Sequence, residues 1–442
     1  MRLSHRWTTL VTLARSTSVV RSPYPRLFHS LPFLLLTAIL IAAGIPYAIK
    51  AAHHGSAIVR WHNQLGELFS GQDIYLRYAY PNPPMMALFL YPLALLPPLA
   101  GALIWYAIKS AAVLLAAIWT FRMIETPERP FPVWTKGLVL LLALKPILGD
   151  LMHGNVNLFI LFLVVGALYA FHQRRDWLAG FVLALAIACK VTPLLFVPYF
   201  LWKRAWKTVG GCALGLVCFV FLVPGGLLGW KENKQLLASW ALQMANPYLV
   251  EGSVLYTQHT NQSLPALVLR LTTSSPSSIT YVDGQLTPAG YHNVIDIGER
   301  AADWLIRGCM AVFAALVVWS CRTRLTERHG WHLPAEFSLV ILGMLLFSER
   351  TWKHHCVGLL LPLAVLVYVL ATDREFDRRL RDCLAVAVGA AAALMWLGGL
   401  DNDFGKWMEI YGVYVWTHLL LVGALTLVLR WCRTPGAAAR WS

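Results

Sequence analysis

The sequence predicts an all-α polytopic integral membrane protein. Of the 442 residues, 58% are hydrophobic and 13% are charged, whereas a soluble globular chain has about 25% charged residues. Long apolar runs extend over the whole chain, which argues against a soluble domain with a single membrane anchor. We expect about 10 to 13 membrane segments, some broken or re-entrant, because a full span needs roughly 20 residues and several runs are shorter or interrupted.

The N-terminal residues 1–30 contain five arginines and no acidic residue, and an apolar run begins at 31. No small-residue cleavage site with a polar mature start follows, so we expect an uncleaved first span and a cytoplasmic N-terminus. The membrane domain is predicted to cover 31–431, and 432–442 is predicted to be a cytoplasmic tail. The candidate spans lie at about 31–49, 85–121, 136–149, 156–172, 178–202, 206–228, 300–320, 335–348, 356–371, 383–399 and 412–430.

Two of these runs are long and are interrupted by prolines. The run at 85–121 contains "LYPLALLPP", and the run at 178–202 contains "CKVTPLLFVP". Proline removes a backbone donor and breaks or kinks a helix. Broken helices are tolerated in a membrane only where their backbone is buried in protein or lines a cavity. Both segments are therefore candidates for a functional site.

The charge of the connectors orients the chain. Basic connectors such as "HQRRDW", "LWKRAWK" and "CRTRLTERHG" are placed on the cytoplasmic side, because lysine and arginine collect there. In the first outer loop, residues 57–69 have apolar members at helical spacing, which predicts a helix lying on the membrane surface. In the longest outer loop, "VDGQ" predicts the turn of a β-hairpin. The loops expected to face outside are 50–84, about 149–156, 229–298, 348–356 and 399–412.

Several classes of protein lose support from missing motifs. The chain has no P-loop, GxSxG elbow or GxGxxG fingerprint, and no DxD in a suitable context, which argues against nucleotide hydrolysis, serine hydrolysis and metal-dependent use of nucleotide sugars. The eight cysteines form no CxxC pair and no HExxH is present, so we expect no metal and no cofactor. The excess of 37 basic over 22 acidic residues fits cytoplasmic loops better than a nucleic-acid interface.

Ionisable and amide side chains next to apolar runs are costly and often functional. In the first outer loop these are the carboxylates Glu67 and Asp73, and Asp73 also fits a helix cap or a turn after Gly71. In "GDLMHGNVN", Asn155 and Asn157 either bind a hydroxylated ligand or complete a tight turn.

Lys190 lies between the two apolar halves of the run at 178–202. The Thr-Pro that follows breaks the helix, which places the ammonium group at a cavity or at the membrane interface. Lys190 either binds an anion such as phosphate or snorkels, so that its ammonium group reaches the membrane surface.

Two later outer clusters hold further polar residues. "TQHTNQSLPALVLR" contains Asn261 and Gln262, either in a binding site or in loop structure alone. Cations in "SERTWKHHC" suit a phosphate or pyrophosphate, whereas two histidines alone make a poor metal site; the alternative is a solvated loop. The basic residues compressed between two spans there are Arg350, Lys353, His354 and His355.

Five segments, taken in order, are similar to the motifs of one known family. "SGQDIY…YAYPNPPMMALFLYPLALLPP" is similar to a G-x-x-x-Y…Y-P-P stretch, and "HGNVNLF" to a G-Q-x-N segment. "ACKVTPLL" is similar to a K-l-t-P segment and is the most specific match. "NQSL" and "TWKHHCVGLLLP" are similar to later Asn-x-Ser-Leu and Trp-x-His-His…Leu-Pro elements. The chain thereby resembles the polyprenol-phosphate-dependent glycosyltransferases of family 87.

The resemblance implies a GT-C-type membrane fold and transfer of a hexose or pentose, with mannose favoured. The donor would be a polyprenyl-phosphate sugar, and the acceptor a lipid or glycan on the extracytoplasmic face of the plasma or inner membrane, with inversion. A carboxylate, Asp73 or Glu67, is expected to act as the general base. The residues expected to bind substrate or donor are Tyr80, Asn155, Asn157, Lys190, Asn261, Gln262, Arg350, Lys353, His354 and His355.

One departure from the family concerns the base. The family has an aspartate in the first outer loop, and counting back from Gly71 places Ser56 and Ala57 at that position. Either Asp73 or Glu67 supplies the base, or the chemistry is altered or lost. A catalytically inactive relative is therefore one alternative to an active glycosyltransferase. The other is a transporter or flippase of lipid-linked or anionic solutes, which would use the same broken helices and Lys190.

Overall fold

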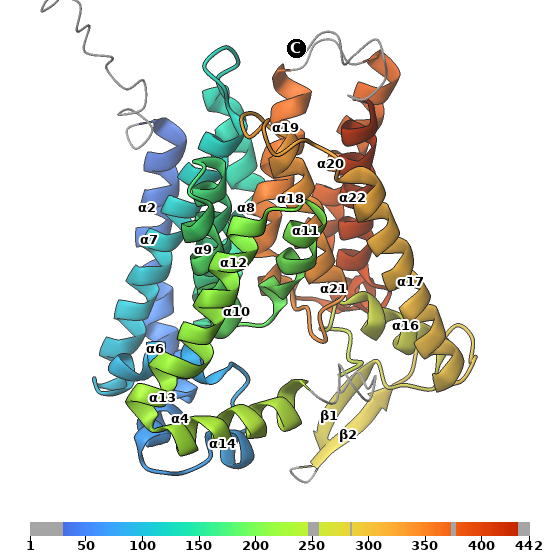
Figure 1. Cartoon of the computed structure of the whole chain (residues 1–442). Coiled ribbons are helices and arrows are strands. Elements are labelled where there is room, and N and C mark those ends of the chain that lie inside the picture. Colours follow the sequence, from blue (N-terminus) through green and yellow to red (C-terminus); the bar gives the residue numbers. More distant parts are fainter. Residues whose placement is uncertain (1–29, 246–255, 283–284, 373–376, 432–442) are drawn as a thin grey trace, which may run out of the picture.

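The computed structural model describes residues 30–245, 256–282, 285–372 and 377–431, and it confirms the predicted all-α architecture. The helices form one bundle (Figure 1), and within the described residues a two-stranded hairpin is the only sheet. The predicted C-terminal tail and all but Ser30 of the basic N-terminal stretch lie outside the described residues.

Seven helices of the described part are long and apolar enough to cross a membrane, and five shorter apolar helices accompany them. The prediction of a multi-pass membrane protein is therefore confirmed. The seven long helical stretches, three of which combine shorter elements given below, are Leu31–Arg60, Pro98–Ile124, Trp206–Leu228, Glu299–Ser320, Lys353–Thr372, Arg378–Gly398 and Val413–Trp431.

In the first half of the chain, α9 contacts both α7 and α10 and is almost entirely buried. Its sequence, NLFILFLVVGALYAFH, is apolar on every side, as expected for a helix surrounded by others. The elements of this half are α2 (Leu31–Ala52), α3 (Ala57–Arg60), α4 (His62–Gly66), η1 (Glu67–Phe69), α5 (Ile74–Tyr78), α6 (Pro84–Ala94), α7 (Pro98–Ile124), α8 (Val133–His153), α9 (Asn157–His172), α10 (Asp176–Cys189), η2 (Thr192–Leu195), α11 (Phe196–Trp202), α12 (Trp206–Leu216), η3 (Val217–Leu222) and α13 (Val223–Leu228).

In the second half, α18, α19 and α22 pack against one another and carry most of the buried apolar side chains. The predicted hairpin is present, with β1 and β2 antiparallel. The elements of this half are α14 (Trp230–Trp240), η4 (Ala241–Ala245), α16 (Leu264–Thr272), β1 (Ser278–Val282), β2 (Gln285–Gly290), α17 (Glu299–Ser320), α18 (His332–Leu346), η5 (Lys353–Leu359), α19 (Leu360–Thr372), α20 (Arg378–Gly398), α21 (Asp403–Ile410) and α22 (Val413–Trp431).

Both proline-interrupted runs are broken where the sequence predicts. The first divides into α6 and α7 around the residues before Pro98. The second divides at Lys190, which ends α10 in an extended conformation with φ −157° and ψ 126°. The chain then continues through the short 3₁₀ helix η2, which contains Pro193, into α11.

The predicted surface helix at 57–69 is wrong as a single continuous element. The structure has three short pieces there, α3, α4 and η1, because ψ is close to 0° at Trp61 and Glu67 rather than near the helical value of about −42°. These bends let Ile58, Leu65 and Leu68 all become buried against the bundle. The apolar spacing therefore reports packing on the bundle by a bent segment.

Three of the segments predicted to face outside, α4, α14 and the hairpin, lie at the lower end of the bundle in Figure 1. The first span α2 begins at the upper end, and the last span α22 ends there. The break after α10 and the start of α9 both lie within the bundle, where a site can be built from several helices.

Candidate functional site

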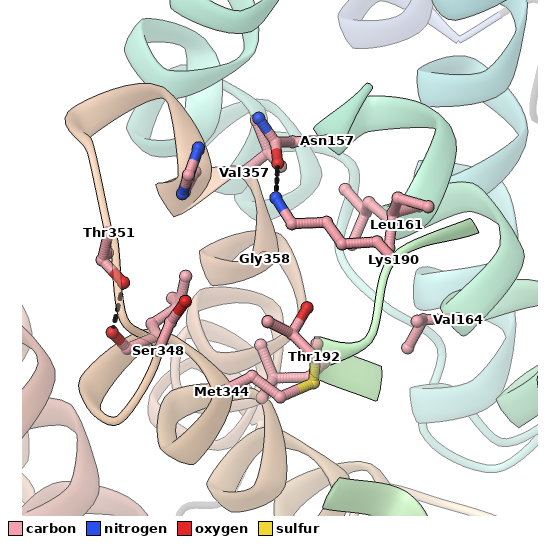
Figure 2. Close-up of a pocket in the computed structure, with 14 residues that line it drawn as sticks. Asn157, Leu161, Val164, Lys190, Thr192, Met344, Ser348, Thr351, Val357 and Gly358 are labelled. Carbon is pink, nitrogen blue, oxygen red and sulfur yellow. Dashed lines mark hydrogen bonds between the residues drawn. The ribbon is translucent and has the colours of Figure 1, made fainter. Parts of the chain in front are cut away.

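A cavity of about 60 Å³ lies between α9, α18, the break after α10 and η5 (Figure 2). One water molecule needs roughly 10–15 Å³ of such space, so the cavity can hold a small polar group such as a phosphate. Most of the cavity wall consists of apolar side chains from α9 and α18. The polar lining residues are Asn157, Lys190, Thr192, Ser348, Thr351 and His355.

The turn between α8 and α9 is fixed by Gly154, whose φ is +68°. A Cβ at this position would lie 2.0 Å from Oγ of Ser56, so the close approach also requires glycine. Ser56 itself is fully buried and its hydroxyl lies 3.0 Å from the hydroxyl of Tyr47. The position at which the family resemblance places an aspartate is thus packed directly against the turn that carries Asn155.

Asp150, near the end of α8, forms a buried ion pair with Lys109 of α7. Oδ2 of Asp150 lies 3.3 Å from Nζ of Lys109, and both side chains are 0% exposed. Oδ2 also accepts a hydrogen bond of 3.2 Å from the backbone N–H of Leu158, one of the first N–H groups of α9, which have no partner within the helix. Asp150 therefore caps α9 and joins it to α7 and α8.

Asn157 links this ion pair to the cavity. Its Nδ2 donates a hydrogen bond of 2.9 Å to Oδ1 of Asp150. Its Oδ1 accepts a hydrogen bond from Nζ of Lys190, as Figure 2 shows. Because an amide has a donor at one end and an acceptor at the other, Asn157 can bridge an anion and a cation at once. The three residues form a continuous polar chain that ends in the ammonium group in the cavity wall.

Asn155 and His354 meet beside this chain. Oδ1 of Asn155 accepts a hydrogen bond of 2.7 Å from the N–H of Val156, so its Nδ2 is the donor to Nε2 of His354 at 3.2 Å. An Nε2 that accepts requires the neutral imidazole to carry its proton on Nδ1. The ring of His153 stacks on that of His354, with centroids 4.4 Å apart. His354 is 3% exposed and is held in one orientation.

Asn261 and Gln262 position the segment that enters η5. Oδ1 of Asn261 accepts a hydrogen bond of 2.9 Å from the N–H of Thr351. Nδ2 of Asn261 donates to the carbonyl oxygen of Glu349 at 2.8 Å. Gln262 donates from its backbone N–H to the carbonyl oxygen of Thr351 at 2.6 Å. Both predicted binding residues are buried and act on the protein backbone, and Thr351 in turn lines the cavity.

Arg270 of α16 stabilises the loop that contains Asn261. It was not among the predicted site residues. Arg270 is fully buried, and its guanidinium donates to five backbone carbonyl oxygens at distances between 2.8 and 3.3 Å. The fork of an arginine suits this arrangement, because it presents five N–H donors in one plane. The accepting carbonyls belong to Ile410, Thr257, Gln258, Asn261 and Glu409.

Arg350 and Lys353 contact acidic and aromatic side chains instead of the cavity. Arg350 lies 3.3 Å from Oε1 of Glu349, and Lys353 donates a hydrogen bond of 2.8 Å to Asp401. Lys353 also lies 3.8 Å from the buried carboxylate of Glu409 in α21. Burial raises the pKa of Glu409 to about 7, although Lys353 opposes the shift.

The two predicted carboxylates of the first outer loop also have structural partners. Asp73 caps α5, accepting hydrogen bonds from the N–H groups of Tyr75 and Leu76 at 2.9 and 3.2 Å. Glu67 accepts from the hydroxyl of Tyr78 at 2.8 Å and from Arg77 at 3.1 Å. None of these residues lines the cavity.

Tyr80 lies nearer to the broken segment. It is fully buried, and burial raises its pKa. Its ring packs against those of Trp61 and Tyr75, and α6, which follows it, packs on α10. The loop before α6 is thereby connected to the helix that ends at Lys190.

The structure thus brings together five of the predicted residues and adds others. The ion-pair partner Lys109 was missed because it lies within a 27-residue helix that reads as an ordinary span. A charged residue inside an apolar run is a signal that can identify it. The five that converge around the cavity and the adjoining turn are Asn155, Asn157, Lys190, His354 and His355.

Comparison with known proteins places these features in context. The model of a family described as Glycosyltransferase family 87 matches residues 80–349. A polyprenol-phosphate-mannose-dependent alpha-(1-2)-phosphatidylinositol mannoside mannosyltransferase of Mycobacterium tuberculosis is 27% identical over 381 residues, which cover 81% of this chain and 79% of that protein. The protein of the same description from Mycolicibacterium smegmatis is 26% identical, over 82% of this chain and 79% of its own length. An alpha-(1->3)-arabinofuranosyltransferase of Corynebacterium glutamicum is 25% identical over 68% of this chain and 62% of its own length.

Proposed function

Because the chain belongs to glycosyltransferase family 87, we propose that it moves a sugar, with mannose favoured, from a polyprenyl-phosphate donor to a lipid or glycan acceptor. The chain is a glycosyltransferase with several membrane-spanning helices. The choice of mannose is supported by two relatives described as polyprenol-phosphate-mannose-dependent. A pentose is the second candidate, because another relative is described as an arabinofuranosyltransferase.

The observation that carries the proposal is the cavity around Lys190. It combines one cationic side chain, an amide and three hydroxyl groups with an apolar wall from α9 and α18. A polyprenyl phosphate has the complementary chemistry, since an anionic head is joined to a hydrocarbon chain. Cationic donors bind phosphate oxygens strongly, and more so where water is excluded.

The proposed reaction is a direct displacement at the anomeric carbon. A hydroxyl oxygen of the acceptor attacks the anomeric carbon, and the bond from that carbon to the phosphate oxygen breaks on the opposite side, so the configuration inverts. The leaving phosphate takes the electron pair, and Lys190 stabilises the charge that develops on it. The proton of the acceptor passes to a carboxylate acting as general base, for which Asp73 and Glu67 of the first outer loop are the proposed residues.

The proposed face of the membrane is extracytoplasmic. The connectors rich in lysine and arginine lie at the upper end of the bundle in Figure 1, and such connectors collect in the cytoplasm. The opposite end carries α4, α14 and the hairpin. With this orientation the N-terminus is cytoplasmic and the first outer loop faces the acceptor.

Purified protein in liposomes tests the proposal. It is given radiolabelled mannose on polyprenyl phosphate, arabinose on polyprenyl phosphate, or mannose on GDP, with a phosphatidylinositol mannoside as acceptor. We expect a labelled glycolipid from the first donor and none from the nucleotide sugar. A product from arabinose alone would change the sugar, and a product only from GDP-mannose would contradict the donor class.

A further inference from the structure

We infer that Lys109 and Asp150 are positioning residues for the donor phosphate: together they orient Asn157 and leave the positive charge of Lys190 available to the ligand. The inference rests on the proposed function, because it assigns roles toward the same anionic donor. Neither Lys109 nor Asp150 lines the cavity, so both act through Asn157.

The side-chain amide of Asn157 has a defined orientation. Its Nδ2 donates to Oδ1 of Asp150, and this contact determines which end of the amide faces Lys190. With Oδ1 directed toward the cavity, the amide accepts from the ammonium group and holds it on the α9 side of the wall (Figure 2). A rotated amide would present two N–H donors to a cation, which is unfavourable. Asp150 therefore orients Asn157, and Asn157 in turn orients Lys190.

The charge of Asp150 is neutralised within the protein. Asp150 is fully buried, and an unpaired buried carboxylate close to the cavity would repel an anionic ligand. Nζ of Lys109 lies 3.3 Å from Oδ2 of Asp150 and 2.8 Å from its backbone oxygen, so the carboxylate is neutralised at the oxygen that does not accept from Asn157. The formal charges of Lys109, Asp150 and Lys190 sum to one positive charge, which is the charge left to bind phosphate.

Three variants separate this role from simple structural support. Lys109→Met leaves Asp150 to neutralise Lys190, so the net charge of the group falls to zero. Asp150→Asn raises the net charge to plus two and keeps an acceptor for the amide of Asn157. The double variant restores one positive charge with neutral side chains at both buried positions. His153, His354 and His355 face the same groups and are common to all four proteins.

The measurement is the affinity of each purified full-length protein for geranylgeranyl phosphate, together with the KM for the polyprenyl-phosphate sugar. We expect Lys109→Met to weaken binding and to raise the donor KM by about tenfold, because one nearby charge is lost in a low-dielectric site. The double variant is expected to bind within about threefold of the wild type, since the net charge is restored. A Lys109→Met protein that binds the phosphate as the wild type does would overturn the inference.

Folding of the single variant is not required for the test. Removing Lys109 alone leaves a buried charge unpaired and can abolish folding. Asp150→Asn and the double variant both have asparagine at position 150, and they differ only in whether residue 109 is lysine or methionine. The inference requires that Asp150→Asn, which keeps the lysine, binds the phosphate more tightly. Equal affinities of these two proteins would refute it. If the wild type binds the phosphate but transfers no sugar, the proposed function fails while the charge effect is still measured.

Discussion

The ammonium group of Lys190 donates a hydrogen bond to the side-chain oxygen of Asn157, although 33 positions separate the two residues in the sequence. One ends the broken helix α10, and the other begins α9. Their contact turns two local features, a helix break and a tight turn, into one wall of a cavity. This contact holds the ammonium group in the cavity wall, where the proposed donor phosphate binds.

Asn157→Leu removes the amide and keeps a side chain of similar size. The variant leaves Oδ1 of Asp150 without its donor, which is expected to lower the free energy of unfolding by about 1–3 kcal/mol. It also frees Lys190, so we expect the donor KM to rise at least about tenfold. Steady-state kinetics with varied donor measure the effect. An unchanged donor KM in folded Asn157→Leu protein would separate Asn157 from the site.

Asn155 is predicted to act through the imidazole of His354. Asn155→Leu removes the donor to Nε2, and Asn155→Asp replaces it with an acceptor that favours a proton on Nε2. We expect both variants to lower kcat, by about tenfold or more, with little change in donor KM, because Asn155 does not line the cavity. If Asn155→Asp keeps the wild-type kcat, the tautomer of His354 is irrelevant to transfer.

The two carboxylates of the first outer loop provide a test of the general base. Asn is as good a helix cap as Asp, so Asp73→Asn is expected to retain α5, whereas Asp73→Ala loses about 0.5–2 kcal/mol of stability. We expect the double variant Asp73→Asn with Glu67→Gln to lose transfer by about a hundredfold or more and to keep its affinity for the donor. Transfer at the wild-type rate by that protein would exclude both residues as the base.

Glu409 is expected to make stability depend on pH. Its pKa is raised by burial from 4.5 to about 7, with Asp401 adding to the shift and Lys353 and Arg270 opposing it; His259 also lies 3.8 Å from the carboxylate. The folded state then binds the proton of Glu409 more tightly than the unfolded state does. The contribution of Glu409 to the free energy of unfolding is fully present below about pH 4.5 and is lost as the pH rises through 7, by up to about 3 kcal/mol.

Glu409→Gln checks this sign. The variant cannot lose a proton, so its Tm relative to the wild type is expected to increase between pH 5 and pH 8. Asp401→Asn is the control, because its hydrogen bond from Lys353 lowers the pKa of Asp401 and gives a small opposite dependence at acidic pH. Parallel curves of Tm against pH for the wild type and Glu409→Gln would show that the carboxylate is already ionised in the folded protein.

Much of the architecture is visible in the sequence because the relevant signals are local. The apolar runs, the two proline interruptions and the hairpin each depend on a short stretch of chain, and the structure has helices, breaks or strands at each, although residues 283–284 of the predicted turn lie outside the described part. Lys190 was identifiable for the same reason, since a lysine followed by Thr-Pro within an apolar run is unusual in itself.

The partners of these residues are not visible, because they come from distant parts of the chain. The contact of Asn155 with His354 spans 199 positions, and the ion pair of Lys109 with Asp150 spans 41. A carboxylate that caps a helix and one that accepts a proton have the same sequence pattern, so the cap formed by Asp73 could not be distinguished from a catalytic role. Asn261 and Gln262 resemble binding residues in sequence, but both are buried and their side chains donate hydrogen bonds to backbone carbonyl oxygens.

The most direct test of the account is the contribution of the phosphate group to binding. The affinities of purified wild type and Lys190→Ala for geranylgeranyl phosphate and for geranylgeraniol are compared, with Lys207→Ala, an exposed lysine of α12, as the control. We predict that the wild type and Lys207→Ala prefer the phosphate by at least about tenfold, and that Lys190→Ala loses most of this preference while it still binds the alcohol. An undiminished preference in Lys190→Ala would contradict the assignment of the donor phosphate to this cavity.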